Sequence, residues 1–366
     1  MKLIIEPDDG PEVLLSAIQS AKKSIEIVIF RFDRAEIEAA LKAAVGRGVS
    51  VSALIAYTNR GGELTLRKLE MRLLKEGVAV SRTAEDLVRY HDKLLIIDRQ
   101  VLYILSFNFT HLDIDHSRGF GIVTHNARLI QEAVKLFEAD IARKPFTSTL
   151  DTFVVSPDNA RKVLGALIRK AKKELLIYDP KIADVGMLRA LGERAKAGVK
   201  IRVIGRVGKQ NPGLEVRHLA KIRLHTRVIV RDGHEAFMGS QSLRRAELDS
   251  RREVGVIVRV SKVVNGIIKT FEADWAMSTA KENEQFTAEL KEIKKESREL
   301  TKEMSPLSPV VKEALKEAES KAEGAGLSPQ EVKETVKEAV KEAVKEAVRD
   351  RVEEVVKVNI PSAKEA

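Results

Sequence analysis

The sequence predicts an α/β protein made of two similar halves, followed by a charged helical extension. Residues 1–280 contain one internal repeat, each repeat alternates short apolar strands with helices, and the composition changes after residue 280. Strands interleaved with helices are typical of a β-sheet flanked by helices. We therefore expect a first half over 1–147, a second half over 148–280 and an extension over 281–366. The halves should pack as a pseudo-dimer with a site at their seam.

The repeat is visible in three pairs of matching segments. The first two pairs are 150 residues apart and the third is 134 residues apart, so the first half carries about 16 extra residues. This insertion is expected within 61–90, where leucines recur at helical spacing. The matching pairs are Ala21-Lys22-Lys23 with Ala171-Lys172-Lys173, Arg47-Gly48-Val49 with Ala197-Gly198-Val199, and Phe137-Glu138-Ala139-Asp140 with Phe271-Glu272-Ala273-Asp274.

The elements of each half follow from the spacing of apolar residues. In the first half, the pattern predicts a helix over 12–22 and an apolar strand over 24–31. An alanine-rich helix over 35–46, ended by a glycine, precedes a second strand over 49–57. The second half repeats this order, and a hairpin and a closing helix complete each half.

A set of polar residues on apolar strands recurs in the same register in both halves. Side chains at positions i and i+2 of a strand face the same way, so His91 and Lys93, placed at the start of a predicted strand, should point together. Asp98 and Asp232 end strands at hairpin turns, where aspartate has a structural role, and we interpret both as scaffold. All offsets are 134: His91, Lys93, Asp98, Ser106 and Asn108 match His225, Arg227, Asp232, Ser240 and Ser242.

This pattern resembles the signature of the phospholipase D superfamily, His-x-Lys-x4-Asp-x6-Gly-Ser-x-Asn, which is normally present twice. The resemblance covers about residues 1–280. It implies a phosphodiesterase with no cofactor and no metal, in which His91 or His225 attacks phosphorus to form a phosphohistidine. The other histidine then protonates the leaving oxygen. Lys93 and Arg227, with Ser106, Asn108, Ser240 and Ser242, would bind the phosphate oxygens.

The chain departs from that signature at several positions. Arg227 replaces a lysine, Ser242 replaces an asparagine, and Leu105 replaces the first-half glycine. The family commonly has a carboxylate beyond each motif that orients a histidine. Glu253 occupies that position in the second half, but its counterpart in the first half is Gly119. We therefore expect Glu253 to contact His91, the favoured nucleophile, and His225 to lack such a carboxylate. If Asp113 or Asp115 reaches His225, this asymmetry has no basis, although the two-histidine mechanism stands.

Composition limits the partners and the location of the protein. The absence of cysteine excludes disulfides, thiol nucleophiles and thiolate metal sites. No apolar run is long enough to span a membrane and the N-terminus does not resemble a signal peptide, so the cytoplasm is the expected location. Residues 281–366 contain 17 Lys and Arg against 20 Asp and Glu, which leaves residues 1–280 with a net charge of +13. Such a charge attracts nucleic acid or an anionic phospholipid surface.

The extension is predicted to be helical. It is rich in Lys, Glu, Ala and Val, and valine recurs every four residues from Val332 to Val356. Because this spacing drifts around a helix of 3.6 residues per turn, it does not form a coiled-coil seam. A solvated helix and a docking or oligomerisation element are both compatible with this pattern.

Three functions are compatible with the sequence. The first is hydrolysis or transfer of phospholipid head groups, and the second is a metal-independent nuclease. The third is an inactive phosphate-binding module, suggested by Arg227, Leu105 and Gly119. The motifs predict the reaction type more closely than they predict the substrate.

Overall fold

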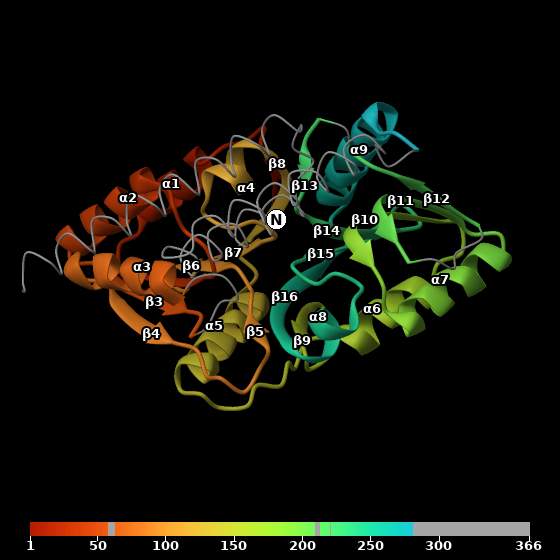
Figure 1. Cartoon of the computed structure of the whole chain (residues 1–366). Coiled ribbons are helices and arrows are strands. Elements are labelled where there is room, and N and C mark those ends of the chain that lie inside the picture. Colours follow the sequence, from red (N-terminus) through yellow and green to blue (C-terminus); the bar gives the residue numbers. More distant parts are fainter. Residues whose placement is uncertain (58–62, 209–212, 220, 281–366) are drawn as a thin grey trace, which may run out of the picture. The chain divides into compact units, whose positions relative to one another are not determined.

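The computed structural model describes residues 1–57, 63–208, 213–219 and 221–280. Residues 1–281 form one compact unit. The predicted helical extension lies outside the described residues. Figure 1 shows the two α/β halves side by side, the first in red to yellow and the second in green to cyan.

The first half follows the predicted order with small differences at element ends. The helix predicted over 12–22 ends at Ser20, and the strands predicted over 24–31 and 49–57 are shorter. The insertion forms a helix, as its leucine spacing predicts. The elements are β1 (Lys2–Glu6), α1 (Glu12–Ser20), β2 (Ser24–Ile29), α2 (Ala35–Gly46), β3 (Ser50–Ile55), α3 (Glu63–Lys75), β4 (Ala79–Arg82), β5 (Arg89–Tyr90), β6 (Leu94–Ile97), β7 (Val101–Leu105), α4 (His111–Asp115), β8 (Ser117–Thr124) and α5 (Ala127–Ile141).

The second half repeats this order without the inserted helix. Its elements are β9 (Phe153–Ser156), α6 (Ala160–Arg169), β10 (Glu174–Ile182), α7 (Val185–Lys196), β11 (Lys200–Val207), β12 (Leu214–Arg217), β13 (Arg223–Leu224), β14 (Arg227–Arg231), β15 (Glu235–Gly239), α8 (Arg245–Asp249), β16 (Arg251–Val258) and α9 (Ser261–Met277).

Each half builds one sheet, and the two sheets have matching strand orders. Within the described residues the first sheet runs β1-β8-β7-β6-β2-β3-β4. The second, read in the same direction, runs β9-β16-β15-β14-β10-β11-β12, and β5 also pairs with β16. Two short strands are exchanged between the halves. β5 of the first half pairs with β16, and β13 of the second half pairs with β8 (Figure 1). Each sheet is therefore completed by a strand from the other half.

The core confirms that the two halves pack against each other. One cluster of buried apolar side chains belongs to the outer face of each half, and a third cluster draws from both halves. In this shared cluster the Phe120 and Tyr178 rings are 5.6 Å apart, and Tyr178 also packs edge-on against Phe271. Burial of this apolar surface favours the packed arrangement.

Two buried arginine–aspartate pairs also join the halves. Arg118 on β8 binds Asp274 on α9 through Nε and NH2, at 2.8 and 3.1 Å. Arg252 on β16 binds Asp140 on α5 in the same way, at 3.1 and 2.9 Å. These four residues match at an offset of 134, so the two contacts are related by the internal repeat. Each is bidentate, which is the strongest geometry for this kind of pair.

We predict that Asp274→Ala destabilises the protein by about 3–5 kcal/mol, because it removes the buried bidentate counter-charge of Arg118 and leaves only the exposed Asp8 as an ionic partner. Urea unfolding followed by circular dichroism measures this loss. Glu272→Ala is the matched control, since Glu272 lies two residues away and pairs with Arg202 at the surface, where such pairs contribute about 0–1 kcal/mol. Equal effects of the two substitutions would contradict the role assigned to the buried pair.

Candidate active site

His91 lies where the chain crosses from one sheet to the other. The preceding strand β5 belongs to the second sheet and the following strand β6 belongs to the first, so residues 91–93 form a connection. The expectation that His91 begins a strand is therefore wrong, because the chain changes sheets at this point. The His91 backbone N–H donates to the Arg252 carbonyl at 2.8 Å, and the Phe30 ring packs edge-on against the imidazole at 4.8 Å.

His225 has the equivalent position in the second half. It follows β13, which pairs with β8, and precedes β14 in the second sheet. Its backbone N–H donates to the Arg118 carbonyl at 3.1 Å. Both histidines are buried, with 8% of His91 and 6% of His225 exposed. Each is thus held by backbone pairing to the opposite half.

The two motifs lie within one electrostatic environment. The charge of Arg227 lowers the pKa of both His91 and His225. Glu253 and Asp113, which contact the two histidines, both act to raise the pKa of Lys93. Residues from both halves therefore act on each imidazole. The expectation that the imidazoles flank a single phosphate stays a prediction.

Glu253 contacts His91, as the sequence predicts. The His91 Nδ1 atom lies 3.1 and 3.0 Å from the two carboxylate oxygens of Glu253, which is fully buried on β16. A neutral imidazole donates its Nδ1 hydrogen to such a carboxylate and leaves the Nε2 lone pair free. Because Glu253 belongs to the second half, the orientation of His91 depends on a residue from across the seam.

The expectation that His225 lacks a carboxylate is wrong. Its Nδ1 atom lies 2.8 Å from Asp113 Oδ1 of the first half, a close polar contact that lacks the alignment of a hydrogen bond. Gly119 indeed supplies nothing, since a Cβ atom there would lie 2.9 Å from the Phe107 ring. Asp113 instead comes from α4, where its backbone N–H donates to the Thr110 hydroxyl at the helix N-cap.

The internal repeat contains a signal for Asp113 as the acid near His225, although position 119 does not. Its counterpart at an offset of 134 is Glu247, so both halves carry an acid there. The two acids also make equivalent contacts. Asp113 accepts from the Asn108 backbone N–H and Glu247 accepts from the Ser242 backbone N–H, both at 2.8 Å.

Burial keeps both imidazoles neutral. It lowers the pKa of His91 well below its usual value, and the charges of Lys93 and Arg227 act in the same direction. Burial also lowers the pKa of His225, to about 3, although Asp113 opposes the shift. A neutral imidazole is the form that can attack phosphorus. An incoming phosphate anion would raise both pKa values and favour protonation of the histidine that serves as acid.

The two motif cations are anchored in the same way. Lys93 Nζ donates to the His91 carbonyl, and Arg227 NH1 donates to the His225 carbonyl at 3.1 Å. Burial lowers the pKa of Lys93 to about 7, with Glu253 opposing. An arginine guanidinium, in contrast to a lysine ammonium, does not lose its proton in proteins. The cations therefore differ in whether they can lose their charge.

The predicted phosphate ligands have varied surroundings. The Ser106 hydroxyl accepts from the Phe120 backbone, and the Ser240 hydroxyl bonds to both backbone groups of Val254. The Asn108 amide donates to Asp113 at 2.6 Å, while its buried Oδ1 has no hydrogen-bond partner in the described part of the chain. The Ser242 hydroxyl accepts from Arg227 Nε. Direct phosphate binding by these four side chains stays a prediction.

Asp98 and Asp232 lie outside this cluster, at the hairpin turns. Each carboxylate accepts hydrogen bonds from three successive backbone N–H groups, 22–24 for Asp98 and 172–174 for Asp232. Both residues have positive φ angles, 53° and 51°. These contacts tie each hairpin to the start of β2 or β10.

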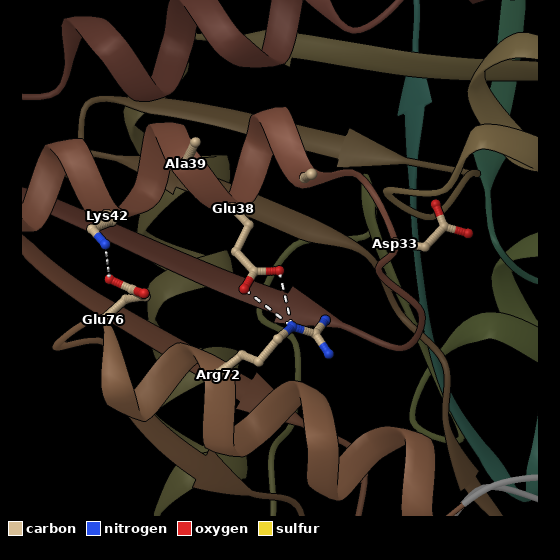
Figure 2. Close-up of a pocket in the computed structure, with 7 residues that line it drawn as sticks. Asp33, Glu38, Ala39, Lys42, Arg72 and Glu76 are labelled. Atoms are coloured by element: carbon tan, nitrogen blue, oxygen red, sulfur yellow. Dashed lines mark hydrogen bonds and ion pairs between the residues drawn. The ribbon is translucent and has the colours of Figure 1, made fainter. Parts of the chain in front are cut away.

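A separate surface groove of about 510 Å³ lies between α2 and α3 in the first half. Figure 2 shows Glu38 turned toward Arg72 and Lys42 turned toward Glu76, with Asp33 apart from both pairs. Glu38 accepts from Arg72 at 3.1 Å, and Lys42 pairs with Glu76 at 2.7 Å. The residues that line the groove include neither histidine, so we assign it no part in the chemistry.

Both halves of the chain are similar to one known protein family. The family described as "Cardiolipin synthase, PLD-like domain" matches residues 14–141 and 164–275. The chain belongs to the phospholipase D superfamily. The two matches coincide with the two halves, which confirms the family, the duplication and the α/β fold class.

Individual relatives match less of the chain. The mitochondrial cardiolipin hydrolase of Danio rerio is 29% identical over 130 residues, which cover 34% of this chain and 56% of that protein. This phospholipase D relative is therefore spanned over little more than half of its length.

Two solved structures show the same fold over most of the described residues. Polyphosphate kinase from Porphyromonas gingivalis has a TM-score of 0.63 at 19% identity, covering 75% of this chain and 50% of that one. Phosphatidylserine synthase from Haemophilus influenzae has a TM-score of 0.59 at 10% identity, covering 76% and 87%. At these identities the likeness concerns the fold.

We predict that Glu253→Gln and Asp113→Asn each lower phosphodiester turnover about 100-fold, because a neutral amide no longer stabilises the positive charge that develops on the neighbouring imidazole during the reaction. Steady-state kinetics on a chromogenic phosphodiester measure the loss. Glu26→Gln is the control, since this buried carboxylate pairs with Arg99 instead of a histidine. Wild-type turnover in Asp113→Asn would show that His225 does not use this acid.

Proposed function

We propose that this protein is a metal-independent phosphodiesterase that acts through a phosphohistidine and hydrolyses or transfers phospholipid head groups. One arrangement carries the proposal. Two buried, neutral histidines from repeated motifs each have a carboxylate of the opposite half at Nδ1. Each also has a cation bound to its own carbonyl.

In the proposed first step, His91 Nε2 attacks phosphorus while the bond from phosphorus to the leaving oxygen breaks. His225, protonated in the complex, gives its proton to that oxygen. Lys93 and Arg227 offset the negative charge that develops on the non-bridging oxygens. In the second step His225 removes a proton from water or an alcohol, whose oxygen displaces His91 from phosphorus.

His91 is proposed as the nucleophile because of how Glu253 contacts its Nδ1 atom. Glu253 places both oxygens within 3.1 Å of His91 Nδ1. Asp113 is shared between His225, the Arg223 guanidinium and Asn108, so part of its charge is already neutralised. The two Glu253 oxygens at Nδ1 hold the His91 tautomer that leaves Nε2 free to attack phosphorus.

A phospholipid substrate is supported by the family match and by the cardiolipin hydrolase relative. None of the described helices has the length and apolar character needed to cross a membrane, so contact with lipid would be peripheral. A nuclease is the second candidate, favoured by the net charge of +13 on residues 1–280. An inactive phosphate-binding module is the third. Cytoplasmic location and a docking role for the extension stay predictions.

We predict that wild-type protein cleaves bis-p-nitrophenyl phosphate in the presence of EDTA, because the proposed chemistry uses only histidines and fixed cations. With radiolabelled phosphodiester, His225→Ala should accumulate an acid-labile phosphoenzyme, since an aryl leaving group needs little protonation. His91→Ala should accumulate none. Label on His225 with His91 dispensable would reverse the roles, and dependence on added divalent metal would exclude the mechanism.

The same preparation distinguishes the substrates. Release of head groups from cardiolipin or phosphatidylglycerol vesicles supports the lipid assignment, whereas cleavage of single-stranded DNA alone supports the nuclease. Binding of inorganic phosphate without turnover of any of these substrates would support the inactive module.

We predict that kcat/KM falls as pH rises through about 7. Burial lowers the pKa of Lys93 to about 7, so its ammonium is present below that pH and lost above it. Above that pH, the fraction of the protein with a charged Lys93 falls about tenfold for each further pH unit, and phosphate binding through Lys93 falls with it. In Lys93→Arg this alkaline fall should disappear, because arginine does not deprotonate. An identical fall in Lys93→Arg would assign the titration to another group.

A further inference from the structure

The second motif departs from the first at two positions that touch each other. Arg227 stands where the first half has Lys93, and Ser242 stands where it has Asn108. Arg227 Nε donates to the Ser242 hydroxyl at 3.2 Å. All four side chains are buried, and Ser242 is only 1% exposed. A change of size at one buried position must therefore be accommodated at the other.

The surroundings of the two pairs are otherwise equivalent. Lys93 and Arg227 each donate to the carbonyl of their own histidine. The backbone N–H groups of Asn108 and Ser242 each donate to an acid in the following short helix, Asp113 or Glu247. The backbone frame is thus the same in both halves. Only the side chains that occupy it differ.

The exchange of side chains is complementary in shape. Serine ends at the atom where asparagine carries its planar amide, and arginine extends beyond lysine by a planar guanidinium. Ser242 therefore leaves space that the Arg227 guanidinium enters, and its hydroxyl accepts the Nε hydrogen. This contact fixes the plane of the guanidinium, whose fork geometry matches two oxygens of one phosphate.

We propose that Ser242 is a positioning residue for Arg227, not a phosphate ligand, and that the coupled pair makes the second half grip the phosphate through the NH1–NH2 edge of Arg227. This inference rests on the proposed phosphodiesterase site and deepens it. NH1 has a second hydrogen beyond the one given to the His225 carbonyl, and NH2 has no hydrogen bond among the described residues. Two parallel N–H groups are then available to the non-bridging oxygens.

The pair also explains how the second motif differs in function from the first. Lys93 offers a single point charge that titrates near neutral pH. Arg227 offers a permanent charge in a fixed plane. The two halves thus divide phosphate binding between a titratable contact and a permanent, directional one.

The test is a double-mutant cycle on binding of inorganic phosphate, measured by isothermal titration calorimetry on the full chain. Ser242→Ala should weaken phosphate binding about 10-fold, and Ser242→Thr, which keeps the hydroxyl, should stay within about twofold of wild type. Arg227→Lys and Ser242→Asn should each weaken binding more. The double variant Arg227→Lys/Ser242→Asn, which copies the first-half pair, should bind more tightly than either single variant.

Ser278→Ala is the matched control, because it removes a serine hydroxyl that bonds the Trp275 carbonyl at the end of α9. It should leave phosphate affinity unchanged. Melting temperatures show whether each variant is folded. Additive effects in the double variant, or wild-type affinity in Ser242→Ala, would overturn the inference even if turnover is normal. Coupled phosphate binding without turnover of any phosphodiester would instead sustain this inference and reject the proposed enzyme.

Discussion

The active site depends on the exchange of two-residue strands between the halves. β5 pairs with β16 and β13 pairs with β8, so the backbone of each histidine is held by the opposite sheet. Arg252 and Arg118 each hold one of these strand crossings through two contacts. Each accepts the histidine N–H at its carbonyl, and each binds a buried aspartate of the other half through its side chain. A shift at the seam would therefore move the histidines, their carboxylates and the halves together.

Short-range patterns were enough to predict the halves, most elements and the paired motifs. Glu253 was predicted as the partner of His91 because family spacing carries that contact. The crossing of residues 91–93 between sheets was missed, since an apolar run does not reveal which sheet a strand joins. The Arg118–Asp274 contact spans 156 residues, so no local pattern in the sequence predicts it or its repeat as Arg252–Asp140.

Positions where the first half departs from the family pattern lie against a neighbouring residue that fits the change. Gly119 lies against the Phe107 ring. In the second half the positions equivalent to Gly119 and Phe107 hold Glu253 and Gln241. Leu105, which departs from the family glycine, is opposite Gly121 on β8, and a Cβ atom on Gly121 would lie 2.8 Å from it. In the second half both corresponding positions, Gly239 and Gly255, are glycines. Each departure from the motif therefore has a local packing partner.

The crossed carboxylates have a consequence for substitutions in either half. Asp113 of the first half serves His225, and Glu253 of the second half serves His91. Two copies of the first half would pair His91 with Asp113, and two copies of the second would pair His225 with Glu253. Neither self-pairing reproduces the present combination of histidine and acid. Each histidine therefore depends on a carboxylate that only the other half of the chain supplies, so a substitution in one half can alter the histidine of the other.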